Sequence, residues 1–93
     1  MQVAILTLTL RLDWCRSLKD KRQEIKGLID TIIRQFHVSA AESEYQDNHN
    51  LSEVTIAFLV FHRAQADKIA DSVVQYVENH SQGELTDIFL ELR

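Results

Sequence analysis

The sequence contains no proline and only two glycines, Gly27 and Gly83. Glycine-built phosphate cradles and long irregular loops are therefore not expected. The single cysteine, Cys15, excludes an intramolecular disulfide framework and is typical of a reducing compartment. The apolar stretch at residues 1–12 is too short to span a bilayer and lacks the charged start and cleavage site of a signal peptide. We expect a cytoplasmic protein that makes no membrane contact.

Length and composition predict one globular domain over residues 1–93. Hydrophobic residues make up 45% of the chain and charged residues 26%, which are ordinary values for a folded protein. A domain of this size buries only somewhat more than ~60% of the surface that its unfolded chain exposes. Its stability should be modest unless copies of the chain associate.

The net charge of −4 is the sum of the charges of two segments, one positive and one negative. Residues 11–36 contain seven basic and four acidic side chains, whereas residues 37–93 contain three basic and ten acidic ones. Such asymmetry is more informative about binding partners than the total charge.

Hydrophobic periodicity predicts four strands and two helices. The strands are expected at residues 3–12, 38–45, 54–61 and 85–92, with a polar loop at residues 46–52. Apolar residues with helical spacing predict helices at about residues 18–36 and 64–78. Ser17 and Asp20 have the spacing of a capping box at the start of the first helix, but the second helix has no usual N-cap residue.

The element order β-α-β-β-α-β predicts an α+β, ferredoxin-like sandwich. In this fold, both helices cover one face of a four-stranded antiparallel sheet. The first and third strands are the most apolar, so they belong in the centre. The nearly continuous apolar sequence of the third strand predicts that it is buried on both faces. The charged residues of the second strand are typical of an edge strand.

The run RSLKDKR at residues 16–22, after an apolar strand, resembles the YlxP-like family of small bacterial proteins of unknown function. Residues 38–42, 46–47 and 64–67 lie where that family has similar segments. The resemblance covers essentially the whole chain and implies a ferredoxin-like fold. It also implies an association with translation, since family members are often encoded near genes for translation and ribosome maturation. It brings no catalytic residues.

Basic residues gather around the start of the first predicted helix. Cations in a first helical turn are unfavourable with the helix dipole by ~0.3–1 kcal/mol each, so local stability gains little from them. An anionic partner would benefit, and the sequence predicts RNA or a ribosomal particle bound by Arg16, Lys19, Lys21, Arg22 and Lys26. The alternative is that these cations are solvated or pair with Glu42, Glu44, Asp67 or Asp71.

Alternation along the strands places a second set of apolar residues on the sheet face away from the helices. Monomers seldom leave such a patch in water, so we expect a homo-oligomer, most simply a two-fold dimer. The predicted interface consists of Val3, Ile5, Leu59, Phe61 and Phe89. There are two alternatives. These residues could face the helices instead, or the C-terminal strand could cover the patch.

No residue pattern reaches the level of a catalytic or metal-site motif. Cys15 has no histidine near it in sequence, and the four histidines show no metal-ligand spacing. RNA-recognition modules of this topology stack bases on aromatic residues of strands one and three, but strand one here offers Thr7 and Thr9. We expect a non-enzymatic accessory protein without cofactor or metal. The alternative is a self-associating scaffold or small-ligand regulatory module that uses the open sheet face.

Overall fold

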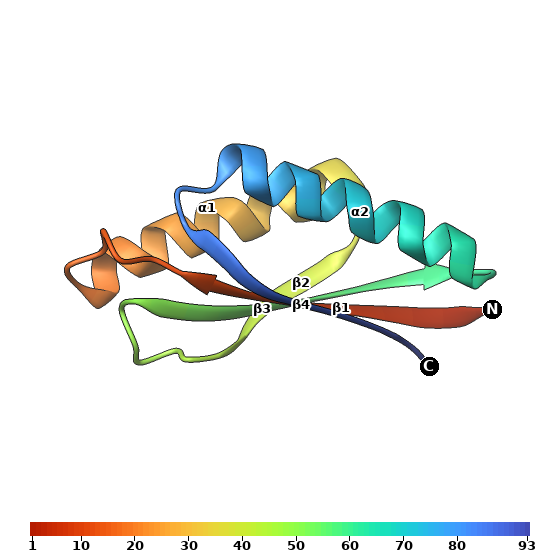
Figure 1. Ribbon diagram of the computed structural model, residues 1–93, viewed down its shortest axis with the longest axis horizontal. Helices are drawn as coiled ribbons and strands as arrows, with labels where there is room; N and C mark the ends of the chain where they lie inside the picture. Colours follow the sequence, from red (N-terminus) through yellow and green to blue (C-terminus); the bar gives the residue numbers. More distant parts are fainter.

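The computed structural model describes residues 1–93 and contains four strands and two helices, arranged as two layers (Figure 1). Every strand pair is antiparallel, and the strand order across the sheet is β2-β3-β1-β4. The predicted α+β, ferredoxin-like fold, with the first and third strands in the centre, is therefore confirmed. The elements are β1 (Gln2–Arg11), α1 (Leu18–Phe36), β2 (Ser39–Glu44), β3 (Leu51–Val60), α2 (Arg63–His80) and β4 (Glu84–Leu92).

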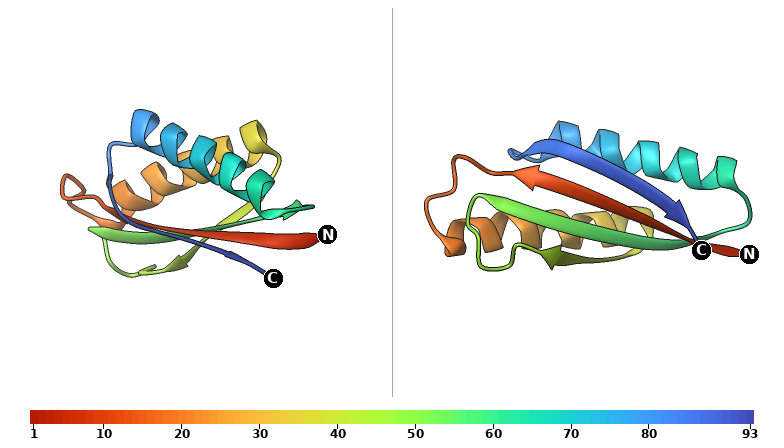
Figure 2. Two further views of the ribbon diagram at one scale, coloured as in Figure 1. Left: turned by 45° about the vertical axis from the view of Figure 1, so that its right-hand side comes forward. Right: turned by 60° about the horizontal axis from the view of Figure 1, so that its bottom comes forward.

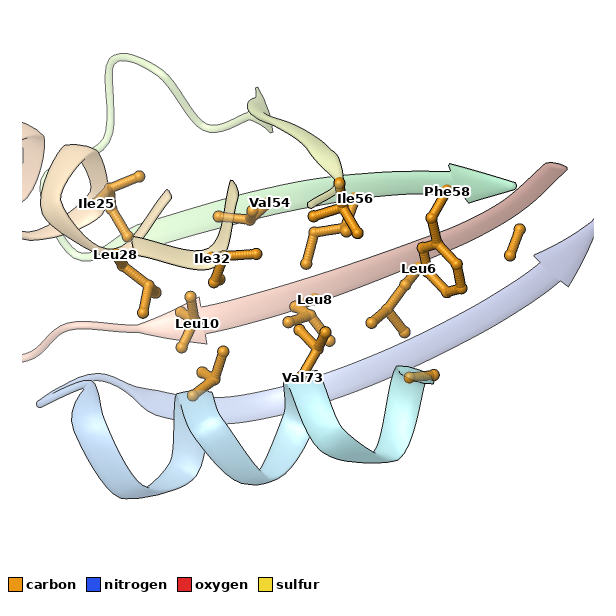
Figure 3. Packing of buried hydrophobic residues seen from close by; sticks show 14 of the residues in the cluster. Leu6, Leu8, Leu10, Ile25, Leu28, Ile32, Val54, Ile56, Phe58 and Val73 are labelled. Atoms are coloured by element: carbon orange, nitrogen blue, oxygen red, sulfur yellow. The ribbon is translucent and has the colours of Figure 1, made fainter. Parts of the chain in front are cut away.

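Both helices cover the same face of the sheet, and the core lies between the two layers (Figures 1 and 2). Every second residue of β1 is fully buried, and its antiparallel partners on β3 are buried beside it. Figure 3 shows these side chains meeting the apolar stripes of the helices, among them Leu6, Leu8, Leu10, Val54, Ile56, Ile25, Leu28, Ile32 and Val73. Neither helix combines the length and the apolar content that a membrane crossing needs.

Strand β3 begins at Leu51, three residues before its predicted start. Leu51 pairs with Arg11 and Ser52 with Leu10, so the long first strand extends the ladder into the predicted loop. Ser52 is fully buried, and its hydroxyl donates to Glu42 Oε2 at 2.6 Å. A polar residue in a strand resembles a loop residue in sequence, which is why the boundary was wrong.

Helix α2 has a histidine N-cap that its sequence did not indicate. His62 is extended, with φ −157°, and its Nδ1 accepts from the backbone N–H of Gln65 at 3.2 Å. In return, the backbone N–H of Phe61 donates to Gln65 Oε1 at 2.8 Å. This resembles the reciprocal bonding of a capping box, except that the side chain of Gln65 accepts from the residue before the cap rather than from His62.

The prediction that β3 is buried on both faces was wrong. Thr55 and Ala57 are half-buried, and 63% of Leu59 is exposed. No helix covers this face of the sheet (Figure 2). Coverage also ends near the β4 edge, where Ile88 lies opposite Leu8 on the helix side and is still 49% exposed.

Candidate interaction surfaces

The structure removes Lys21 from the predicted RNA-binding set. Its side chain is fully buried, and Nζ lies 2.9 Å from Glu42 Oε2. The same ammonium donates to the carbonyl oxygens of Tyr45 at 2.6 Å and Leu51 at 3.1 Å. All three donors of the ammonium have protein acceptors. Lys21 therefore has a structural role that joins α1 to β2 and to both ends of the β2–β3 loop.

This role could have been found in the sequence. Lys21 stands four and seven residues before Ile25 and Leu28, so it lies on the apolar stripe of α1. A lysine on such a stripe needs a buried acceptor. Glu42 lies on the inward face of β2 and supplies one.

The other four predicted residues are exposed and form what we call the basic face, consisting of Arg16, Lys19, Arg22 and Lys26. Lys26 pairs with Asp30 one helical turn away, at 3.0 Å. The structure shows no ion pair at Arg16, Lys19 or Arg22. The alternative that acidic residues elsewhere neutralise the predicted cations therefore holds only for Lys21 and Glu42.

The start of α1 is fixed by the predicted cap. Ser17 is extended, and its hydroxyl accepts from the backbone N–H of Asp20 at 3.1 Å. The Asp20 carboxylate accepts from the backbone N–H of Arg16, also at 3.1 Å. The cap thus fixes the backbone from which Arg16 and Lys19 project.

We expect Ser17→Ala to lower the free energy of unfolding by ~1 kcal/mol, because one N–H group of the first turn loses its acceptor. Urea unfolding measures this change. Ser72→Ala, in the interior of α2, is the matched control and should lie within ~0.5 kcal/mol of the wild type. Equal stability of Ser17→Ala and the wild type would show that the cap contributes nothing.

Two turns at this end of the molecule are tied together by Asn50. Its side-chain amide donates to the carbonyl oxygens of Leu12 and Cys15, both at 3.1 Å. The backbone N–H of Leu12 donates to the carbonyl oxygen of Asn50 at 2.7 Å. These bonds join the β1–α1 turn, which carries the half-exposed Trp14, to the β2–β3 loop.

The open face is the second candidate surface, and its strand parity is as predicted. Val3 lies directly opposite Leu59, and Ile5 lies opposite Ala57, on the side away from the helices. Phe89 lies opposite Thr7 on the same side. The exposed large apolar residues of the predicted set are Val3, Leu59, Phe61 and Phe89, whereas Ile5 is half-buried.

The open face lacks the aromatic pair that sheet-based RNA recognition would need. Phe58 faces the helices and is buried, so it presents no ring on this side. Thr7 and Thr55 occupy the centre of the face. Stacking of bases across β1 and β3 is therefore not supported by the residues present.

Cys15 is buried beside the core. Burial raises the pKa of its thiol above the ordinary value, and the negative charges of Asp20 and Glu24 raise it further, against a smaller opposing effect of Lys21. A thiol in this environment is a weak nucleophile. The structure contains no cluster of three or more histidine, cysteine or acidic side chains arranged to hold a metal ion.

Comparison with known proteins finds a family without an assigned activity. Residues 3–89 match the model of a family described as a protein of unknown function, DUF503. The chain is also 30% identical over 70 residues to the uncharacterized protein YlxP of Bacillus subtilis (strain 168). That similarity covers 75% of this chain and 76% of the relative.

Proposed function

The chain belongs to the DUF503 family, whose function is unknown, and from this premise we propose that it is a non-enzymatic accessory protein that binds RNA or a ribosomal particle. The observation that carries the proposal is the set of exposed cations without ion pairs at Arg16, Lys19 and Arg22. Arg16 lies just before the N-cap of α1, and Lys19 and Arg22 lie in its first turns, in a protein whose net charge is −4.

The geometry suits backbone contacts better than base recognition. Arginine and lysine side chains on a helix reach phosphate oxygens and fix the orientation of a nucleic acid without reading its sequence. Lys19 and Arg22 are three residues apart and therefore neighbours on the helix surface. The buried Lys21 beside them holds the helix on the sheet, so the cations project from a rigid base.

A triple variant with Arg16, Lys19 and Arg22 replaced by alanine tests the proposal. A hydrogen bond to a charged group contributes ~1.5 kcal/mol or more, so the loss of three should weaken RNA binding by about three orders of magnitude or more. The matched control replaces Arg34, Arg63 and Lys68 with alanine, which removes the same charge away from the basic face. Equal loss of binding in both variants would assign the effect to net charge alone.

A second candidate function, self-association as a scaffold, is favoured by a different observation. Four large apolar side chains on or beside the open face are exposed, and such patches on soluble proteins commonly mark interaction sites. This function does not involve the basic face, because that face lies on the helix layer (Figure 1).

A further inference from the structure

The exposed apolar residues of the open face lie on the half of the sheet that ends at the two chain termini, with Phe89 nearest the centre. Figure 2 shows both termini at this end of the sheet. Val3 and Leu59 are directly opposed across β1 and β3, and Phe61 follows the end of β3. Phe89 adds a ring from β4, opposite Thr7 and four residue pairs along the sheet from Val3. The exposed fractions of Leu59, Phe61 and Phe89 are 63%, 75% and 58%. We call this set the apolar end of the open face.

The opposite end of the same face is acidic. One row across the sheet contains Glu44 on β2, Glu53 on β3, Thr9 on β1 and Asp87 on β4, each directly opposite its neighbour. Like charges directly opposed across strands repel each other. A nucleic acid or an anionic lipid surface laid along the face would meet these carboxylates. At the apolar end, the Glu91 carboxylate lies opposite Ile5 and is paired with Arg93 at 2.8 Å. The distribution therefore favours an apolar partner that covers only this end.

We infer that this partner is a second copy of the chain, packed face to face over the apolar end with its strands running in the opposite direction. The inference rests on the second candidate function and gives it a geometry. A two-fold axis across the strands near the Val3–Leu59 pair brings the Val3–Leu59 pairs of the two copies together, with Phe89 at the margin of the contact. It also carries the two acidic ends to opposite extremes of the dimer. An overlay with parallel strands would instead place Glu44, Glu53 and Asp87 against their own copies.

The overlap predicts a weak, reversible dimer. The molecule measures 41 Å by 21 Å along its two longest axes. Because the axis lies near the Val3–Leu59 pair, close to the end of the sheet, the overlap spans about a third of the length. It covers about 300 Å² on each copy, or about 600 Å² in total, which is well below the size of standard stable interfaces. Dissociation constants in the micromolar range or weaker follow. Both basic faces remain free at the outer ends of this dimer.

Sedimentation equilibrium of the full chain, from about 10 μM to about 1 mM, tests the inference in the range where weak interfaces dissociate. The wild type should shift from 10.8 kDa toward twice that mass, and Leu59→Glu should stay monomeric. Ile33→Glu, at an exposed apolar position on α1, is the matched control and should still dimerise. A monomer at every concentration would assign the apolar end to a different partner and overturn the inference. A dimer that survives Leu59→Glu would also overturn it.

Engineered cysteines test the direction of packing. Leu59→Cys lies near the proposed axis, so oxidation should link it to its own copy, whereas Asp87→Cys at the acidic end should form no disulfide link. The native Cys15 is buried and out of reach. Efficient linking through Asp87→Cys would contradict the antiparallel end overlap. The RNA affinity of Leu59→Glu, measured separately, should equal that of the wild type. This measurement distinguishes failure of the dimer inference from failure of the RNA proposal.

Discussion

Replacing Lys21 with alanine is expected to destabilise the protein by about 3–5 kcal/mol, the cost of removing one partner from a buried ion pair. The Glu42 carboxylate would lose the ammonium that lies 2.9 Å away, and two carbonyl oxygens would lose their donor. Lys19→Ala, two residues earlier on the exposed surface, should change stability by less than ~0.5 kcal/mol. Urea unfolding of both variants makes the comparison.

The double variant Lys21→Met, Glu42→Gln separates the charge from the packing. The neutral amide keeps an acceptor for the hydroxyl of Ser52, which donates to Glu42 in the wild type. Without an unpaired buried charge, this variant should recover part of the stability that Lys21→Ala loses. If Lys21→Ala were as stable as Lys19→Ala, the ammonium could not lie in the buried position described here.

Leu8→Ala is expected to lower the free energy of unfolding by about 2–5 kcal/mol, because Leu8 is fully buried at the centre of β1 and the truncation leaves a cavity. Leu59→Ala removes the same group from the open face, where 63% of the residue is exposed. Its effect on the monomer should be within ~0.5 kcal/mol. Thermal or urea unfolding at low protein concentration measures both.

The two leucines are a direct test of which sheet face the helices cover. A large loss at Leu59 and a small loss at Leu8 would reverse the assignment of the faces. Equal large losses would mean that both faces of the sheet are covered in the folded monomer.

The arrangement of the elements could be predicted because its determinants are local and repetitive. Alternating leucines on β1, with Val54, Ile56 and Phe58 on β3, specify which face of the sheet is buried, and a one-residue error would reverse every side chain. The apolar stripe of α1 specifies the helix face that meets them. Agreement between these patterns leaves few topologies open.

The errors fall where a polar side chain has a partner far away in sequence. Ser52 and Glu42 are ten residues apart, and Lys21 and Leu51 are thirty apart, so their hydrogen bonds depend on strand register and helix placement. Considered alone, Lys21 belongs to a basic run, and Ser52 belongs to a loop. Only the three-dimensional contacts show that both are buried. His62 is a different case, since its cap is local but uses an uncommon residue.

The salt dependence of RNA binding tests the central claim most directly. A fluorescently labelled single-stranded RNA, titrated with the wild-type protein at several salt concentrations from about 50 to 200 mM, gives the number of phosphate contacts from the slope of log K against log salt. Three contacts by Arg16, Lys19 and Arg22 predict a slope of about −2 with this single-stranded RNA. The alanine variant of these three residues should bind with a slope near zero. Absence of binding by the wild type at about 50 mM salt, or the same slope for both proteins, would contradict the account.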